Sequence, residues 1–217
     1  MKTLIVCAGQ NENFSFAKSI GVGLVEASIG LSELVRAKKP ERLIFIGTCG
    51  LYNKRAENEN DLNLAHFGEK SLTNERDKLL IKKGKKSLIS EPATKLLEIY
   101  ESAHCFHIEA SKLTSGFYSP AECEINLNVS YETKKCNSSN YICTDENIAA
   151  KFANLGLELE NMESFAVLSV AKHFKIPATC FLCATNFCDT NAHQIFLQNH
   201  AQAKKNLEYF LQEKNLI

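Results

Sequence analysis

The chain has 217 residues, a length that suits one α/β domain, and its 45% hydrophobic and 23% charged residues are typical of a soluble globular protein. The 25 Lys and Arg balance the 25 Asp and Glu, so no net field favours nucleic acid or an anionic membrane as a partner. No apolar run approaches the roughly 20 residues of a membrane-spanning helix, and the N-terminus carries no recognisable signal peptide. Nine Cys, an odd number, therefore predict free thiols and a cytoplasmic location.

The first fifty residues are typical of a βαβ unit. Residues 3–9 (TLIVCAG) form a continuous apolar run that predicts a buried strand, and residues 23–39 carry a helical stripe of apolar side chains. A second buried strand is predicted at 43–46, followed by a Gly-Thr-Cys-Gly turn at 47–50. A strand, a helix and a strand in this order imply a parallel sheet.

The middle of the chain is less regular. Residues 52–90 are its most polar part, and we expect a solvated excursion there. Beyond it, the pattern predicts a short helix at 92–103, a strand followed by a turn-rich loop at 106–122, and a strand at 141–144. A helix capped by Asp145 should follow and end near Gly156.

The last third alternates strands and helices again. We expect a short strand at 156–160, a helix from Met162 to Phe174, a central apolar strand at 178–185 and a long amphipathic helix at 193–216. No internal repeat or linker interrupts the chain. We therefore predict a single α/β domain over residues 1–217, with a mostly parallel central sheet flanked by helices in three layers.

Polar groups follow the predicted strands where an open α/β sheet binds its ligands, beyond the carboxyl ends. Among them are Glu12, Thr48, Thr144, Glu163 and Asn186. Glu163 begins a predicted helix, whose N-terminus would hold its carboxylate ionised and facing a cleft. An ionised carboxylate accepts from two hydroxyls at once, and a ribose offers such a pair.

The order of the elements and four short stretches resemble the nucleoside phosphorylase and nucleosidase superfamily. The stretches are IGVGLVEAS (20–28), GTCG (47–50), CTDENI (143–148) and NMES (161–164), the last followed about twenty residues later by a strand that ends in Thr-Asn. The chain looks like a purine nucleoside phosphorylase, and is also similar to methylthioadenosine/adenosylhomocysteine nucleosidase and futalosine hydrolase. The resemblance implies that fold and cleavage of an N-glycosidic bond.

The resemblance also implies roles for single residues. Glu163 would bind the 2′ and 3′ hydroxyls of the ribose, with Met162 packed under the sugar. Asn186 stands where many members have Asp; its amide would hydrogen-bond the purine at N7 or O6, which favours a 6-oxopurine. Glu12 would activate water, as in hydrolytic members. The predicted catalytic residues are thus Glu12, Glu163 and Asn186, and the substrate-binding residues are Gly47, Thr48, Thr144, Asn161, Met162, Glu163 and Phe187.

The nucleophile stays open at this point. Phosphorolytic members usually bind phosphate with Arg, but none of the four Arg follows the first strand or directly precedes GTCG. Phosphate would have to rely on Thr48, on the backbone N–H groups of the Gly turn, or on an Arg from a neighbouring subunit. The aromatic residue that members carry near CTDENI is replaced by Asn147, for which Phe187 or Tyr141 could substitute. The resemblance implies a purine nucleoside as partner, a homodimer or higher homo-oligomer, and no metal or cofactor apart from phosphate as a possible co-substrate.

Three other interpretations are weaker. Gly21 and Gly23 form part of a dinucleotide-binding fingerprint, but Glu26 occupies the position of its third Gly. Cys180 and Cys183 have C-x-x-C spacing, yet residues three apart on a strand face opposite sides, so buried thiols are expected rather than a zinc site. A member of the fold that binds nucleosides without cleaving them is the alternative function, and the retained acidic and amide side chains argue against it.

Overall fold

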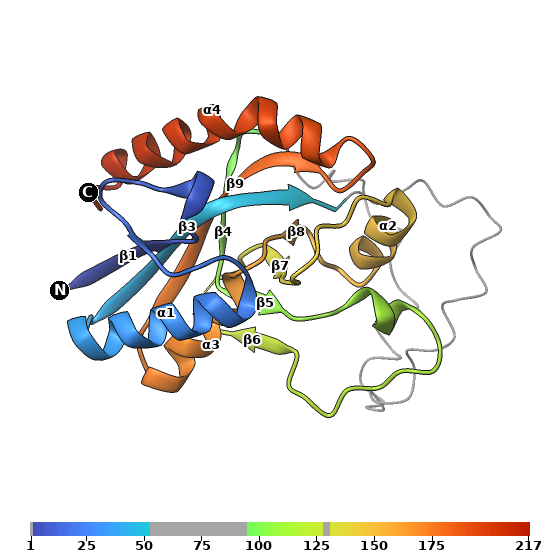
Figure 1. Cartoon of the computed structure of the whole chain (residues 1–217), viewed down its shortest axis with the longest axis horizontal. Coiled ribbons are helices and arrows are strands. Elements are labelled where there is room, and N and C mark those ends of the chain that lie inside the picture. Colours follow the sequence, from blue (N-terminus) through green and yellow to red (C-terminus); the bar gives the residue numbers. More distant parts are fainter. Residues whose placement is uncertain (1, 53–94, 128–130) are drawn as a thin grey trace, which may run out of the picture. The chain divides into compact units, whose positions relative to one another are not determined.

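The computed structural model describes residues 2–52, 95–127 and 131–217, and these residues belong to one compact unit (Figure 1). The solvated excursion predicted at 52–90 lies outside the described residues apart from Tyr52. A single domain over residues 1–217 accordingly stays a prediction.

Nine strands form one mixed, mostly parallel sheet in the described part of the chain. They are β1 (Thr3–Cys7), β2 (Lys18–Ser19), β3 (Arg42–Leu51), β4 (Ile99–Ser102), β5 (His104–Phe106), β6 (Glu124–Asn126), β7 (Lys135–Asn137), β8 (Leu159–Glu160) and β9 (Ala178–Phe187). Strand β3 is the branch point: it runs parallel to β1 and β9 and ends antiparallel to β8. The order continues from β8 through β7 and β5 to β6, while β4 pairs with β9.

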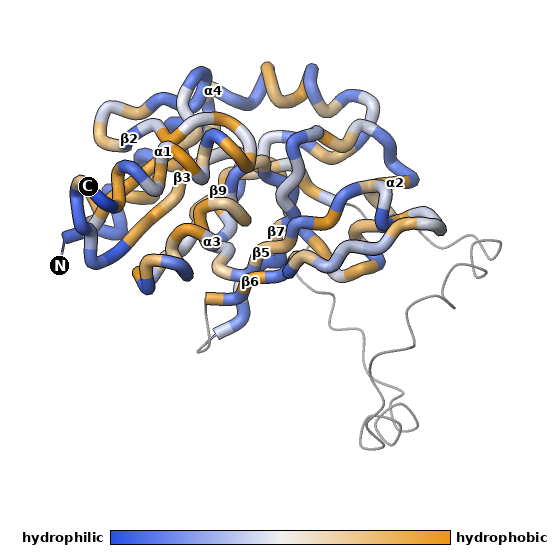
Figure 2. Tube along the Cα trace, turned by 60° about the horizontal axis from the view of Figure 1, so that its bottom comes forward, coloured by the Kyte–Doolittle hydropathy of each residue, from blue (hydrophilic) through white to orange (hydrophobic). Residues whose placement is uncertain are grey.

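Helices cover both faces of the sheet (Figure 1). Helix α4 (Ala192–Glu213) packs over β3 and β9 on one face, and α1 (Gly23–Lys38) and α3 (Ser164–Phe174) pack together on the other. Residues Leu43 and Phe45 of β3 belong to the core under α1 and α3, whereas Ile44 and Ile46 belong to the core under α4. Burial on both faces explains the unbroken apolar runs of β3 and β9, which Figure 2 displays. The predicted three-layer α/β fold is confirmed.

The helical predictions agree with the structure in most places. Helix α2 (Glu146–Asn154) begins after Asp145, whose carboxylate accepts from the backbone N–H of Asn147 and Ile148. Gly156 follows its end with a φ of 81°. Cys180 and Cys183 of β9 are buried free thiols in different cores, as their spacing predicts.

Three local predictions were wrong. The Gly-Thr-Cys-Gly stretch at 47–50 is no turn, because β3 continues through it to Leu51 with a register shift against β9 between Cys49 and Gly50. Residues 99–102, expected in a helix, form β4, since pairing with the central strand β9 outweighs a helical pattern of Leu and Ile. Residues 141–144 form no strand; Tyr141 and Ile142 are exposed, and the strand of this region is β7, a few residues earlier.

Candidate active site

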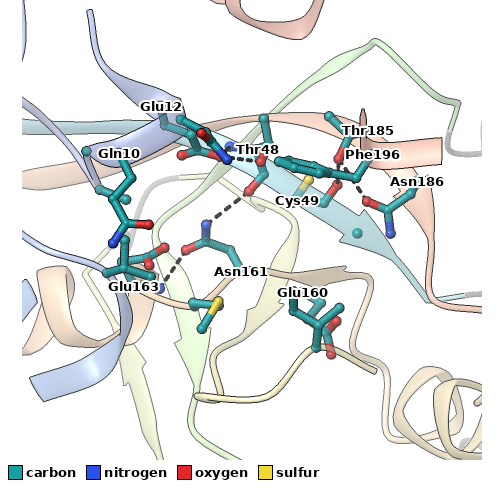
Figure 3. Close-up of a pocket in the computed structure, with 17 residues that line it drawn as sticks. Gln10, Glu12, Thr48, Cys49, Glu160, Asn161, Glu163, Thr185, Asn186 and Phe196 are labelled. Atoms are coloured by element: carbon teal, nitrogen blue, oxygen red, sulfur yellow. Dashed lines mark hydrogen bonds between the residues drawn. The ribbon is translucent and has the colours of Figure 1, made fainter. Parts of the chain in front are cut away.

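A cavity of about 180 Å3 lies where β1, β3 and β9 end and α3 begins (Figure 3). Four segments line it, 8–12, 48–50, 160–163 and 185–186, together with Val22, Ile142 and Phe196. The segments come from both ends of the sequence, and the parallel strands bring them to one edge of the sheet. The cavity therefore occupies the place where the sequence predicts a ligand.

Glu12 reaches the cavity from a 3₁₀ turn, Gln10–Glu12, directly after β1. Its Oε1 accepts hydrogen bonds from the backbone N–H of Thr48, at 3.1 Å, and from the Thr48 hydroxyl. Its Oε2 is buried and has no hydrogen-bond partner among the described residues. Burial raises the pKa of Glu12, while the Thr48 hydrogen bonds and the charge of Lys204 oppose that rise. One oxygen is thus fixed, and the other makes no hydrogen bond within the described part of the chain.

Gly47 does not line the cavity but leaves room for Glu12. A Cβ at this position would lie 2.9 Å from Oε2 of Glu12, closer than real Cβ contacts come. The predicted role of Gly47 in binding phosphate has no support in this position. Its absent side chain instead lets the carboxylate lie against β3.

Glu163 is buried at the wall of the cavity and is held by a distant helix. We expected the N-terminus of its own helix to keep it ionised, but its side chain makes no capping bond to α3. Its Oε1 accepts from the backbone N–H of Gly23, at 2.8 Å, at the N-terminus of α1. Burial raises the pKa of Glu163 to about 7, and the nearby charge of Glu12 adds to that rise. Near neutral pH the carboxylate is therefore only partly ionised.

Asn161 performs the capping that Glu163 does not. Its Oδ1 accepts from the backbone N–H of Glu163 and from both the N–H and the hydroxyl of Ser164, at 2.7–2.9 Å. Its Nδ2 donates to the carbonyl oxygen of Thr48, at 3.0 Å. This buried amide ties the start of α3 to β3, and so fixes Glu163 relative to Thr48 and Glu12 (Figure 3).

Asn186 lies across the cavity, near the end of β9. Its Oδ1 accepts from the Thr185 hydroxyl at 2.8 Å, and its Nδ2 donates to the carbonyl oxygen of Phe187 at 3.0 Å. The second bond fixes which end of the amide is the donor, because a carbonyl oxygen can only accept. One N–H of the amide remains for a ligand.

The cavity brings together most, but not all, of the predicted residues. Glu12, Thr48, Asn161, Met162, Glu163 and Asn186 line it. Phe187 packs against the main core, and Thr144 and Tyr141 line a neighbouring cavity of about 200 Å3. Sequence reasoning missed Phe196, which α4 brings to the cavity, and Glu160, which lines both cavities. In the sequence, the only signal for Glu160 is that it stands three residues before Glu163 in a stretch flanked by apolar residues.

The described lining of the cavity contains three carboxylates and no Lys or Arg. Lys204 is the nearby cation: its Nζ donates to the carbonyl oxygen of Asn11 at 3.3 Å and its charge acts on Glu12. No helix among the described residues has the length and apolar character needed to cross a membrane.

Comparison with known proteins agrees with this fold. A sequence profile of the phosphorylase superfamily matches residues 112–213. A search of curated proteins finds no significant match. Among solved structures, a futalosine hydrolase mutant of Helicobacter pylori superposes with a TM-score of 0.67 at 12% identity, covering 98% of this chain and 97% of that chain.

Two nucleosidase structures are also similar. The 5′-methylthioadenosine nucleosidase of Helicobacter pylori, a mutant with 5′-methylthioadenosine in its active site, gives a TM-score of 0.63 at 13% identity and covers 98% of both chains. The 5′-methylthioadenosine/S-adenosylhomocysteine nucleosidase of Colwellia psychrerythraea, in complex with adenine, gives 0.61 at 14% identity, covering 95% of this chain and 90% of that one. The profile of the phosphorylase superfamily thus matches residues 112–213, and the solved structures share the fold of this chain.

Proposed function

We propose that the protein hydrolyses the N-glycosidic bond of a purine nucleoside and releases the free base and ribose. One observation carries the choice of water as nucleophile: Glu12 lines the cavity, and while Thr48 fixes one of its oxygens, the other is buried and has no hydrogen-bond partner among the described residues. A general base needs a free lone pair and a pKa near the working pH, and burial moves the pKa of Glu12 upward, toward that range.

The proposed reaction uses three side chains. Glu12 takes a proton from water as the water oxygen bonds to C1′, and the electron pair of the C1′–N9 bond leaves with the base. The ionised form of Glu163 accepts from the ribose 2′ and 3′ hydroxyls, and its charge stabilises the cationic sugar of the transition state. The free N–H of Asn186 donates to N7 or O6 of the departing purine, which supports a 6-oxopurine. The base takes up a proton from Glu12 through solvent, which regenerates the carboxylate.

Phosphorolysis is the weaker alternative at this site. Phosphate would carry its negative charge into a cavity whose described lining already holds Glu12, Glu160 and Glu163 and no cationic side chain. A further negative charge beside buried carboxylates disfavours binding by an amount on the order of several kcal/mol, because burial lowers the effective dielectric constant. Water carries no such penalty.

The test is to incubate the protein with inosine or guanosine, with and without phosphate, and to identify the sugar by mass spectrometry. Free ribose, formed at a rate independent of phosphate, is expected. Glu12→Gln should slow base release by about 100-fold or more, the scale of a general base. Glu33→Gln, which alters an exposed residue of α1, serves as the control.

Other products would reject parts of the proposal. Ribose 1-phosphate, formed faster as phosphate rises, would make the protein a phosphorylase. Binding of inosine without release of base would instead favour a non-catalytic member of the fold. We also retain the predictions of a cytoplasmic homo-oligomer; a monomer by light scattering at micromolar concentration would contradict the second.

A further inference from the structure

The turn that carries Glu12 is short and conformationally demanding. It spans Gln10–Glu12 directly after β1 and follows Gly9, whose φ is 98°. Gln10 has a φ of 51°, in the left-handed region that residues other than glycine rarely adopt. Within the turn, the backbone N–H of Glu12 donates to the carbonyl oxygen of Gly9 at 2.9 Å, and Nδ2 of Asn13 donates to that of Gln10 at 2.8 Å. Since a 3₁₀ turn has poor hydrogen-bond geometry, contacts from outside the turn contribute to holding it.

Helix α4 supplies such contacts along one face. Phe196, His200 and Lys204 are four residues apart, a spacing that aligns side chains along a helix. Phe196 lines the cavity, and the centre of its ring lies 5.1 Å from that of His200. Nζ of Lys204 donates to the carbonyl oxygen of Asn11 at 3.3 Å and lies 5.3 Å from the centre of the Phe14 ring. This face of α4 therefore runs from the wall of the cavity to the turn.

His200 shares the Asn11 carbonyl with Lys204. Burial and the charge of Lys204 lower the pKa of His200, and a hydrogen bond with the Asn11 backbone opposes that shift. Because donation favours the charged ring, this opposition makes the imidazole the donor and the Asn11 carbonyl the acceptor. A carbonyl oxygen has two lone pairs, which Lys204 and His200 fill together. The lowered pKa leaves the ring neutral at neutral pH, so the ammonium and the ring do not repel each other.

Packing alone explains His200 poorly. The side chain is half-buried, and its Nε2 is buried without a hydrogen-bond partner among the described residues. A buried polar atom without a partner is unfavourable, whereas a Leu would fill the same space without that cost. Phe14 and Phe16, which follow the turn, already pack against the apolar core under α4. The imidazole is therefore better explained by its hydrogen bond to the turn than by contact with the core.

Building on the proposed function, we propose that His200 and Lys204 are positioning residues for Glu12: they hold the Asn11 carbonyl, and through it the turn from which the carboxylate reaches the cavity. Thr48 of β3 fixes the Glu12 side chain, and the two residues of α4 fix its backbone. The general base is thus held by two separate elements of the fold. Neither α4 residue has to touch the substrate or the reacting atoms to act in this way.

The experiment measures kcat and KM for inosine in the wild type, His200→Leu and His200→Gln. His200→Leu cannot donate to Asn11 and should lower kcat by about 10- to 100-fold, the scale for a reacting group displaced by about 1 Å. KM should hardly change, because the residues proposed to hold ribose and base lie on other segments. His200→Gln keeps a donor and should restore most of the rate. His193→Leu is the matched control, since it makes the same substitution at an exposed residue of α4.

Combination with Glu12→Gln tests whether the effect acts through the general base. In that background His200→Leu should cause no further loss of kcat, because no base is left to position. An additive loss would mean that His200 acts independently of Glu12 and would overturn the inference. Wild-type kcat in His200→Leu would overturn it as well, and so would equal losses in His200→Leu and His200→Gln.

Hydrogen exchange separates failure of this inference from failure of the proposed function. If no nucleoside is cleaved, the exchange of backbone amides in residues 8–14, measured by mass spectrometry, still decides. Faster exchange in His200→Leu than in the wild type and His200→Gln supports the hold of α4 on the turn, and equal exchange rejects it. If circular dichroism shows that His200→Leu does not fold, the same comparison uses Lys204→Met, with the exposed neighbour Lys205→Met as its control.

Discussion

Glu163 offers a sharp test because one substitution should act in opposite directions on activity and on stability. Burial raises its pKa from 4.5 to about 7. Each unit corresponds to about 1.36 kcal/mol, so the ionised side chain lowers the free energy of unfolding by about 3 kcal/mol. The hydrogen bond from Gly23 replaces only part of the hydration that the carboxylate loses.

The pH range of this effect follows from the two pKa values. Below about pH 4.5 both the folded and the unfolded chain carry the proton, and Glu163 costs no stability. Between pH 4.5 and 7 the unfolded chain releases the proton while the folded protein keeps it, so stability falls as pH rises. Above pH 7 the loss is complete.

Glu163→Gln cannot ionise, and its amide oxygen can still accept from Gly23. At pH 8 the variant should be more stable than the wild type by up to about 3 kcal/mol, which corresponds to a Tm higher by about 6–12 °C for a chain of this size. At pH 5 most of the difference should be gone. Turnover of inosine should fall by about 100- to 1,000-fold, because the group that stabilises the cationic sugar is lost.

Thermal melts by circular dichroism at pH 5 and pH 8 measure the stability, and base release measures the activity. Glu158→Gln is the control, because it removes an ion pair with Lys134 and should not stabilise the protein at either pH. A Glu163→Gln variant that melts at or below the wild-type temperature at pH 8 would refute the reasoning that the ionised Glu163 side chain lowers the free energy of unfolding.

Three further predictions concern the surroundings of the site. Lys204→Met should move the acid limb of the kcat/KM profile to higher pH, because the Lys204 charge lowers the pKa of Glu12; an unchanged profile would exclude Glu12 as the titrating base. Gly47→Ala should displace the Glu12 carboxylate and so reduce turnover, and it should lower the free energy of unfolding in urea by about 1–3 kcal/mol. Wild-type activity in this variant would show that the Glu12 side chain moves away from the added methyl group without loss of function. Asp145→Ala should lower the unfolding free energy by about 1 kcal/mol, since α2 loses its N-cap; no change in the urea midpoint would contradict that cap.

The sequence predicts the parts of the site that depend on local patterns. Glu163 stands at the start of a strongly patterned helix and Asn186 near the end of a long apolar strand, and the rule that ligands bind at strand ends is enough to bring them to one cavity. Pairing over long distances is not visible in the sequence. The partner of Glu163 is a backbone N–H 140 residues away, so the sequence could not show which helix holds the carboxylate.

Short strands were missed for a similar reason. Strands β4 and β7 have four and three residues and little alternation, and they form because β9, β5 and β8 offer hydrogen-bond partners. The Gly-Thr-Cys-Gly stretch was misjudged as a turn because its Gly residues usually end a strand. In β3 they keep space free beside Glu12 and Asn186, a function of packing that only the folded structure reveals.

The pairing of β3 with β9 determines when the site can exist at all. The Thr185 hydroxyl donates to the carbonyl oxygen of Cys49, 136 residues earlier in the chain. Helix α4, which follows β9, contacts two segments that line the cavity: Asn199 donates to the carbonyl oxygen of Thr185, and Lys204 donates to that of Asn11. A nascent chain still attached to the ribosome at α4 thus has the separate acidic and amide side chains but no assembled cavity. Pairing between segments so far apart in the sequence slows folding, so activity should appear only after α4 has left the ribosome.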